Sequence, residues 1–160
     1  MTQPSYLGVD LGGTQLRMAV VDGSGALTSE VVSVATGRDF RPLDFTSEIG
    51  RLWRTLQTSS TGLEIAALGV GTPGVIVNQT ITESDNLPLL NGADLRALAS
   101  RAVDFPVNVE NDARCFALAE ARYGAGQGAG SICGLTLGTG VGCGVIIGGN
   151  IHRGANSAAG

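Results

Sequence analysis

Two glycine-rich turns lie far apart in this chain, and each carries groups that can donate hydrogen bonds. The first comprises Gly12, Gly13, Thr14 and Gln15, and the second comprises Gly138, Thr139 and Gly140. A β-rich run precedes and follows each turn, which predicts two β hairpins. Bare backbone N–H groups and a hydroxyl at a hairpin tip suit phosphate oxygens. For Thr14 and Gln15 the alternative is ordinary exposed turn chemistry.

Asp10 lies at the end of the first predicted strand, just before the first glycine turn. A carboxylate in this position can hold Mg²⁺ by way of water, beside a transferring phosphate. The alternative is a turn-forming aspartate that bonds its own backbone.

A run of three polar residues, Glu110-Asn111-Asp112, ends a short predicted strand and begins a predicted helix. Asparagine and aspartate are both favoured N-caps, so we expect one of them to cap this helix. Capping leaves the rest of the run unexplained. A carboxylate fixed at such a corner can take a proton from a hydroxyl group, while the neighbouring amide holds another hydroxyl.

Two loops between these motifs are candidates for ligand contact. Gly74 follows Pro73, and the pair fits the centre of a type II turn. The functional alternative is that the bare backbone of Gly74 approaches a ligand. Asn86 lies in a polar loop that leads into Pro88, where its amide can bond to a pair of sugar hydroxyls. The alternative is an ordinary loop.

Hydrophobic periodicity predicts the elements that position these motifs. Strands are expected at 6–11, 16–21, 27–34, 63–70 and 107–109, with a paired strand–turn–strand unit inside 132–147. Helices are expected at 40–56, 92–102 and 113–123. The run 63–70 is predicted to be buried on both faces of a sheet, and the helix 113–123 to be buried over most of its surface.

The order of these elements predicts an α/β fold with a mixed sheet, followed by the start of a second unit. A glycine- and alanine-rich linker at 124–130 is the predicted boundary. We therefore expect one domain at 1–123, with the linker and the opening hairpin of a second domain at 124–160. A lone hairpin is marginally stable, and this one is apolar along both strands. It is expected either to dock on another chain or to continue into a longer protein.

The composition argues against several classes of function. The chain has 160 residues, of which 43% are hydrophobic and 15% charged, as in core-forming globular proteins. The net charge of −4 predicts no general attraction to nucleic acid or to an anionic membrane. No apolar stretch is long enough to span a bilayer, and no export signal is evident, so a cytoplasmic location is expected. The three cysteines lack Cys-x-x-Cys spacing, which argues against a disulfide framework and against zinc.

Five segments, in this order, make the chain resemble a ROK-family sugar kinase, within the actin/hexokinase/Hsp70-like ATPase superfamily. They lie at 10–22, 69–74, 86–88, 109–120 and 137–142. The resemblance runs along nearly the whole chain and covers the N-terminal portion of the family, which continues with zinc-binding and adenine-binding parts. Gln15 stands where the family commonly has a lysine or asparagine.

The resemblance implies an actin-like (ribonuclease H-like) ATPase domain with a mixed five-stranded sheet. It also implies phosphorylation by ATP of the 6-hydroxyl of a hexose or N-acetylhexosamine, with glucose and N-acetylglucosamine expected first. Asp112 is then the general base, and the sugar is lined by Gly74, Asn86, Asn111 and Asp112. Asp10 serves Mg²⁺ through water, and the ATP phosphates are bound by Gly12, Gly13, Thr14, Gln15, Gly138, Thr139 and Gly140.

Two alternatives to a kinase stay open. One is a ROK-type sugar-sensing regulator, although the acidic balance and the early first strand, which leaves no room for a helix-turn-helix, count against DNA binding. The other is a fragment that binds sugar without catalysis. In each case the apolar hairpin predicts a homodimer or other self-association.

Overall fold

The computed structural model describes residues 4–59, 64–138 and 140–160. The chain divides into two compact units, Met1–Val109 and Glu110–Gly160. The division falls before the helix 112–123, because this helix packs on the hairpin that follows it. The boundary expected from the sequence lies after the helix.

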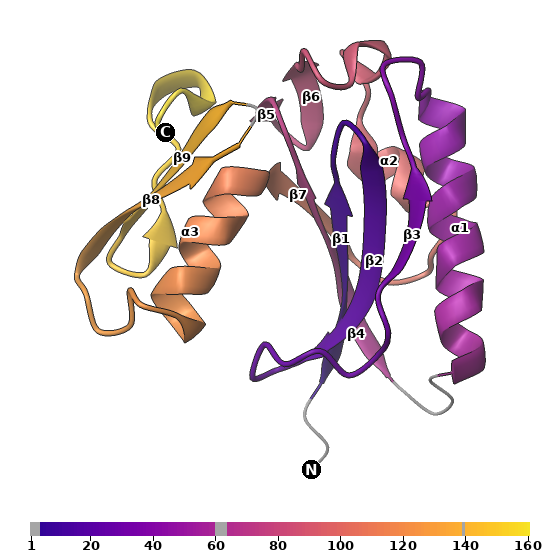
Figure 1. Ribbon diagram of the computed structural model, residues 1–160, viewed down its shortest axis with the longest axis horizontal. Helices are drawn as coiled ribbons and strands as arrows, with labels where there is room; N and C mark the ends of the chain where they lie inside the picture. The colour runs from indigo at the N-terminus through magenta and orange to yellow at the C-terminus, as the bar shows by residue number, and fades with distance from the viewer. Residues whose placement is uncertain (1–3, 60–63, 139) are drawn as a thin grey trace. The chain divides into compact units, whose positions relative to one another are not determined.

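Unit 1 is built on a five-stranded sheet with the strand order β3-β2-β1-β4-β7 (Figure 1). The strands are β1 (Ser5–Leu11), β2 (Gln15–Asp22), β3 (Val32–Ala35), β4 (Ile65–Thr72) and β7 (Val107–Asn111). β1 pairs antiparallel with β2 and parallel with β4, so the sheet is mixed. The predicted α/β class with a mixed five-stranded sheet is confirmed.

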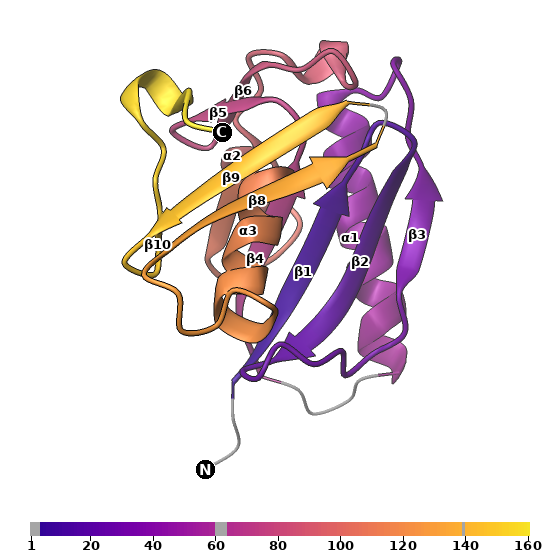
Figure 2. The same cartoon turned by 60° about the vertical axis from the view of Figure 1, so that its left-hand side comes forward.

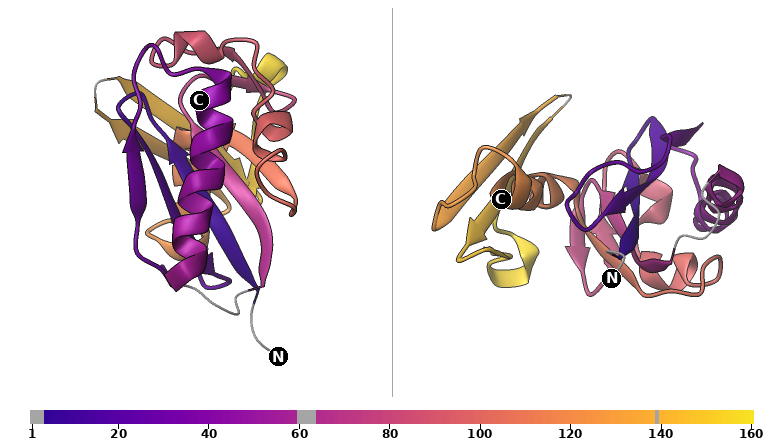
Figure 3. Two further views of the ribbon diagram at one scale, coloured as in Figure 1. Left: turned by 90° about the vertical axis from the view of Figure 1, so that its right-hand side faces the viewer. Right: turned by 90° about the horizontal axis from the view of Figure 1, so that it is seen from below.

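Two helices, α1 (Pro42–Ser59) and α2 (Leu95–Ala99), accompany this sheet, and α1 lies along one of its faces (Figure 3, left). Pro42 opens α1, where its missing N–H costs no helical bond. The side chains at helical spacing on its inner face are fully buried, namely Phe45, Ile49, Leu52 and Leu56. They meet alternate side chains of β1 and β2, such as Leu7, Leu11, Leu16 and Met18, in one core cluster.

The other face of the sheet is open in unit 1. Tyr6, Asp10, Gln15 and Arg17 on this face are exposed, and a side chain at Gly69 would meet no atom within 4 Å. The prediction that 63–70 is buried on both faces is therefore wrong for the described part of this run, 64–70. Leu63, at the start of that run, lies outside the described residues.

Two further predicted elements are shorter than expected. In place of a strand at 27–34, β3 begins at Val32, because the Ser29 hydroxyl accepts the Val20 N–H at 2.9 Å where a ladder carbonyl would do so. In place of a helix from Gly92, α2 begins at Leu95. Gly92 has φ +83°, which a right-handed helix excludes, and the Asp94 side chain caps the helix by accepting the Ala97 N–H.

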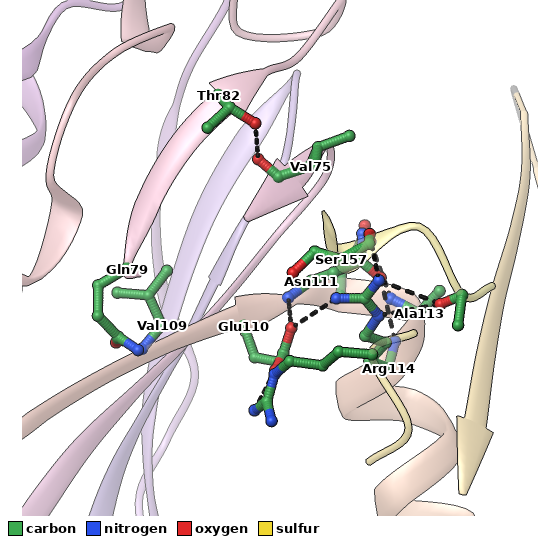
Figure 4. A network of polar contacts seen from close by, with 12 residues as sticks. Val75, Gln79, Thr82, Val109, Glu110, Asn111, Ala113, Arg114 and Ser157 are labelled. Atoms are coloured by element: carbon green, nitrogen blue, oxygen red, sulfur yellow. Dashed lines mark hydrogen bonds and ion pairs between the residues drawn. The ribbon is translucent and has the colours of Figure 1, made fainter. Parts of the chain in front are cut away.

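A small two-stranded ribbon, β5 (Val75–Val77) and β6 (Thr80–Glu83), follows β4. Its turn places Gln79 at φ +71°, a left-handed conformation that is uncommon for a residue other than glycine. The Gln79 side-chain oxygen accepts the Val109 N–H at 2.6 Å (Figure 4). Because β7 is the edge strand, this amide receives a partner that a further strand would otherwise provide.

Unit 2 consists of α3 (Asp112–Tyr123) and a three-stranded sheet of order β10-β9-β8 (Figure 2). The strands are β8 (Ser131–Leu137), β9 (Val141–Ile147) and β10 (Asn150–Ile151). The helix lies directly on β8 and β9 because glycines face it. A Cβ at Gly144 would lie 2.6 Å from the Ala113 carbonyl oxygen, and one at Gly134 would lie 2.8 Å from the Ala117 Cβ.

The prediction that α3 is buried over most of its surface is wrong. Ala113, Arg114 and Ala117 are buried, whereas Phe116 and Tyr123 are exposed. The reason is that the β8–β9 hairpin covers one face of the helix. Across the described parts of the chain, no helix is both long and apolar enough to cross a bilayer.

Candidate active site

The first glycine turn in unit 1 is held by backbone and hydroxyl contacts. The Gly12 N–H donates to the Gln15 carbonyl at 2.8 Å, which closes the hairpin. Thr36 braces the turn from the end of β3, since its hydroxyl donates to the Gly12 carbonyl at 2.7 Å and its N–H to the Thr14 carbonyl at 3.0 Å. The predicted hairpin tip is thus present, with a fixed backbone.

Asp10 lies on the open face of the sheet, opposite Arg17 in the β1–β2 register. The Arg17 guanidinium approaches the Asp10 carboxylate to 3.6 Å and also donates to the Gln15 side-chain oxygen at 3.2 and 3.1 Å. Gln15, which stands where the resemblance leads us to expect a lysine or an asparagine, accepts these bonds through its side-chain oxygen. Positive charge is present beside the turn, two residues farther along the strand.

Asn86 and the first turn lie side by side in unit 1. A Cβ at Gly13 would lie only 2.9 Å from the Asn86 Cβ, so glycine at this position is what allows the approach. The loop that carries Asn86 is tied down next to it, because the Arg38 guanidinium donates to the Asp85 carbonyl at 2.8 Å. A predicted phosphate residue and a predicted sugar residue are therefore neighbours.

Gly74 lies where β4 turns into β5, with φ +108°. The positive φ agrees with the predicted type II turn. A side chain here would collide with the Glu83 carbonyl oxygen and lie 2.8 Å from the Ser84 Cβ. The turn and this close approach already require glycine, whether or not a ligand also passes near it.

Asn111 and Asp112 lie at the corner between β7 and α3. Asn111 is the N-cap, as expected for one of the two, and its side-chain oxygen accepts the Arg114 N–H at 3.1 Å. Asp112 is the first residue of α3 and is exposed, and its Oδ1 accepts the Ala113 N–H at 2.8 Å. The helix N-terminus favours this negative charge, so the carboxylate is held in place and open to solvent.

Glu110, whose role capping left unexplained, is the centre of a charged cluster (Figure 4). Its carboxylate pairs with Arg114 at 3.3 Å and with Arg153 at 2.6 Å, and it accepts the Asn111 N–H at 2.9 Å. Arg114 is buried, and its guanidinium also donates to the carbonyls of Ser157 and Ala159 at 2.7 and 3.1 Å. The cluster fixes the corner and ties the segment 153–159 to it.

The second glycine turn lies between β8 and β9. The Gly138 N–H donates to the Gly140 carbonyl at 2.9 Å, and Thr139 lies outside the described residues. A Cβ at Gly138 or at Gly140 would meet no atom within 4 Å, in contrast to Gly142 and Gly144 nearby. Packing among the residues that the structure describes therefore gives no reason for glycine at these two positions.

The structure brings together part of the predicted site in each unit. In unit 1 it places Asn86 against Gly13, in the hairpin turn that follows Asp10. Gly74 packs on Ser84, two residues before Asn86 in the same loop. In unit 2 it joins Asn111 and Asp112 at one corner.

The residues present fit a magnesium ion held through water. Asp10 offers an exposed carboxylate, and Mg²⁺ is commonly held by one or two carboxylates together with substrate phosphates. Among the described residues, no group of three or more histidine, cysteine, aspartate or glutamate side chains gathers into a metal site. A cavity of about 380 Å³ in unit 1 is lined by residues such as Trp53, Arg54, Asp104 and Phe105. None of the predicted site residues lines it, so we place the chemistry at the loops.

Sequence reasoning missed Arg17, Thr36 and Arg114. For Arg17 a signal was available, because a tight hairpin at 12–15 sets Leu11 opposite Leu16 and therefore Asp10 opposite Arg17. For Arg114 there was none, because its carbonyl partners lie 43 and 45 residues away in the chain.

Comparisons with known proteins agree on one family. The sequence profile of the ROK family matches residues 6–160. The N-acetylgalactosamine kinase AgaK of Shewanella sp. (strain ANA-3) is 32% identical over 156 residues, which cover 97% of this chain and 49% of that protein.

Solved structures give the same result. The ROK hexokinase from Thermus thermophilus superposes with a TM-score of 0.80 at 33% identity, covering 94% of this chain and 49% of that one. A ROK glucokinase from Streptomyces griseus, in complex with glucose and AMPPNP, gives a TM-score of 0.77 at 34% identity, covering 94% and 46%. The predicted actin-like ATPase fold class is thereby confirmed. The chain spans about half the length of these relatives, and the match over residues 6–160 shows that it belongs to the ROK family.

Proposed function

We propose that this chain is part of an ATP-dependent sugar kinase that phosphorylates the 6-hydroxyl of a hexose or N-acetylhexosamine. In this proposal 1–123 is the N-terminal subdomain and 124–160 the start of the C-terminal one. The observation that carries the proposal is the exposed carboxylate of Asp112, fixed at the β7–α3 corner of a ROK-family chain. The relatives named above act on N-acetylgalactosamine or bind glucose and an ATP analogue, which supports this substrate class.

The proposed chemistry asks the protein mainly to position groups. The oxygen of the sugar hydroxyl attacks the terminal phosphorus of ATP while Asp112 accepts the hydroxyl proton, and ADP leaves. Asn111, Asn86 and Gly74 line the sugar. The turns at 12–15 and 138–140 supply N–H groups to the phosphates, and the open space at Gly138 and Gly140 leaves room for close approach.

Magnesium, when bound, neutralises charge that develops on the transferring phosphoryl group. Asp10 is the residue proposed to hold it, through water. Arg17 pairs with Asp10 and Gln15, so it keeps both side chains directed along the open face of the sheet beside the turn.

The test is ADP release from Mg-ATP with glucose, N-acetylglucosamine, N-acetylmannosamine and fructose. The 160-residue chain is compared with Asp112→Asn and with Asp104→Asn, an exposed aspartate away from the predicted site. We expect sugar-dependent release that falls by at least about a hundredfold in Asp112→Asn, the lower range for general-base catalysis, and is unchanged in Asp104→Asn.

Equal release by Asp112→Asn and the unmodified chain would exclude Asp112 as the base. If the 160-residue chain releases no ADP, calorimetric titration with each sugar distinguishes two outcomes. Sugar binding without turnover indicates a fragment that binds sugar without catalysis. Absence of both would contradict the proposal for this chain.

A further inference from the structure

Two of the three cysteines lie next to each other on one face of the β8–β9 hairpin. In the strand register Cys133 is opposite Val145 and Cys143 is opposite Leu135, so the two cysteines form a diagonal pair. Their Sγ atoms are 3.3 Å apart, within hydrogen-bonding distance for sulfur. Cys115 belongs to α3 and is separate from this pair.

The cysteine pair lies on the face of the hairpin that points away from α3. Gly134 and Gly144, which contact the helix, occupy the alternate strand positions and therefore the opposite face. Cys133 is exposed and Cys143 is half-buried. The hydrogen bond with the Cys133 thiol raises the pKa of the Cys143 thiol above its ordinary value of 9.0. Because Cys133 is the more exposed of the two, it is the thiol that a small molecule reaches first.

We propose that Cys133 and Cys143 form a reversible dithiol–disulfide pair that exchanges with small-molecule disulfides such as oxidised glutathione. The Cys133 thiolate attacks one sulfur of oxidised glutathione, and one reduced glutathione leaves. Cys143 then loses its proton and attacks the Cys133 sulfur of the mixed disulfide, which expels the second glutathione. Two protein thiols are oxidised by two electrons, and one glutathione disulfide is reduced to two thiols.

The diagonal register makes this disulfide reducible rather than permanent. Diagonal residues on antiparallel strands have Cα atoms about 7–8 Å apart, whereas relaxed disulfides prefer about 5.5–6 Å. Closing the bond must therefore shift or twist the two strands relative to each other and stores strain, and strained exposed disulfides are the labile ones. The bond would join the two strands that flank the turn at 138–140, so oxidation acts on the hairpin that carries this turn.

The test is peptide mapping after equilibration of the reduced chain with glutathione buffers of increasing oxidised fraction. The chain is kept dilute enough to be monomeric, because the cysteine pair shares its face of the hairpin with Leu135, Leu137, Val141 and Ile147 and association through this face would cover it. Free thiols are alkylated and the chain is cleaved with trypsin, which cuts after Arg114, Arg122 and Arg153. Cys133 and Cys143 then share one peptide, while Cys115 lies in the preceding one. We expect the shared peptide to lose two hydrogens and to resist alkylation, the Cys115 peptide to stay alkylated, and dithiothreitol to reverse the change.

Two variants serve as controls. Cys143→Ser removes the resolving thiol, so Cys133 should accumulate as the mixed disulfide with glutathione, while Cys115→Ser should still form the pair. Alkylation of both Cys133 and Cys143 in the most oxidising buffer would overturn the proposal. Accumulation of the mixed disulfide in the unmodified chain, or a disulfide between two chains, would overturn it as well. The measurement on the unmodified chain needs neither variant to fold, and it does not depend on kinase activity.

Discussion

Arg114 carries a charge where little water reaches it, with 4% of its surface exposed. Burying a guanidinium is costly unless each side of it meets an acceptor. Glu110 supplies the opposite charge, and the carbonyls of Ser157 and Ala159 supply neutral acceptors. The arginine therefore ties the segment 157–159 to the Glu110 side chain, beside the start of the helix that carries Asp112.

Replacing this arginine with methionine tests that role. Arg114→Met keeps the length of the apolar stem but leaves buried acceptors without donors. We expect unit 2 to lose about 3 kcal/mol of stability, which is near the lower end for breaking a buried ion pair. The loss is at the lower end because Glu110 keeps its second partner, Arg153. The measurement is amide hydrogen exchange over α3. The fluorescence of Trp53, the single tryptophan, should report an unchanged unit 1.

The matched control for this change is Arg122→Met. Arg122 is exposed near the end of the same helix, so its loss should change stability by no more than about 0.5 kcal/mol. Similar exchange rates in the two variants would contradict a structural role for the buried guanidinium.

Asp22 offers a residue-scale test of pH dependence. Its carboxylate accepts the Ser24 hydroxyl at 2.6 Å and the N–H groups of Ser24 and Ala26 at 2.8 and 3.1 Å, and the Ser24 hydroxyl bond is the main cause that holds the pKa of Asp22 below its ordinary value of 3.8. A pKa lowered by folding stabilises the folded state above the unfolded pKa, and the effect disappears as pH falls through the folded pKa.

Asp22→Asn should therefore lower stability at neutral pH by more than it does at a pH below the folded pKa of the carboxyl. The effect is small because solvent still reaches this half-buried side chain. It is measured as the difference in urea midpoint between variant and parent at the two pH values. An equal difference at both would mean that the charge of Asp22 contributes nothing to this turn.

At the scale of elements, the glycines of unit 2 fall into two kinds. Gly144 faces α3 so closely that a Cβ would lie 2.6 Å from the Ala113 carbonyl oxygen, whereas Gly138 has open space. Gly144→Ala should therefore push the helix away from the hairpin and cost about 1–3 kcal/mol. Hydrogen exchange over β8 and β9 measures this loss.

Gly138→Ala is the matched change at the hairpin tip, with an expected effect on stability within about 0.5 kcal/mol. If the turn binds phosphate as proposed, the same methyl group should weaken binding of ATP. Equal destabilisation by the two alanines would show that close packing of α3 on β9 is not what requires glycine at position 144.

Elements with a strong local signal were predicted well from the sequence. The hairpin at 5–22 and the helix α1 follow from turn composition and from apolar spacing, and Asn111 acts as one of the two expected caps. The elements whose length or burial was predicted wrongly depend on contacts with other parts of the chain. β3 is short because the Ser29 hydroxyl replaces a ladder acceptor, and the burial of β4 and α3 depended on which surfaces the rest of the chain covers. Periodicity carries no information about such contacts.

On the scale of the whole chain, apolar burial is distributed unevenly. The core cluster lies entirely within unit 1, from Leu7 to Val109. In unit 2 the hairpin face opposite α3 exposes large apolar side chains, namely Leu135, Leu137, Val141 and Ile147. Exposed apolar strands of this kind are sites of association between chains. We therefore expect the 160-residue chain to self-associate through this hairpin face.

A charge placed at the turn end of this face should prevent such association. Leu137 is 80% exposed, so Leu137→Glu removes no packing within the chain and should shift light scattering toward the mass of a monomer, 16.2 kDa. Leu27→Glu is the matched control, because Leu27 is a 61% exposed leucine of unit 1 and its substitution should leave the mass unchanged. If the parent chain is already monomeric at high concentration, the hairpin face does not drive association. If both variants reduce the mass equally, the association is non-specific hydrophobic contact and not a property of β8 and β9.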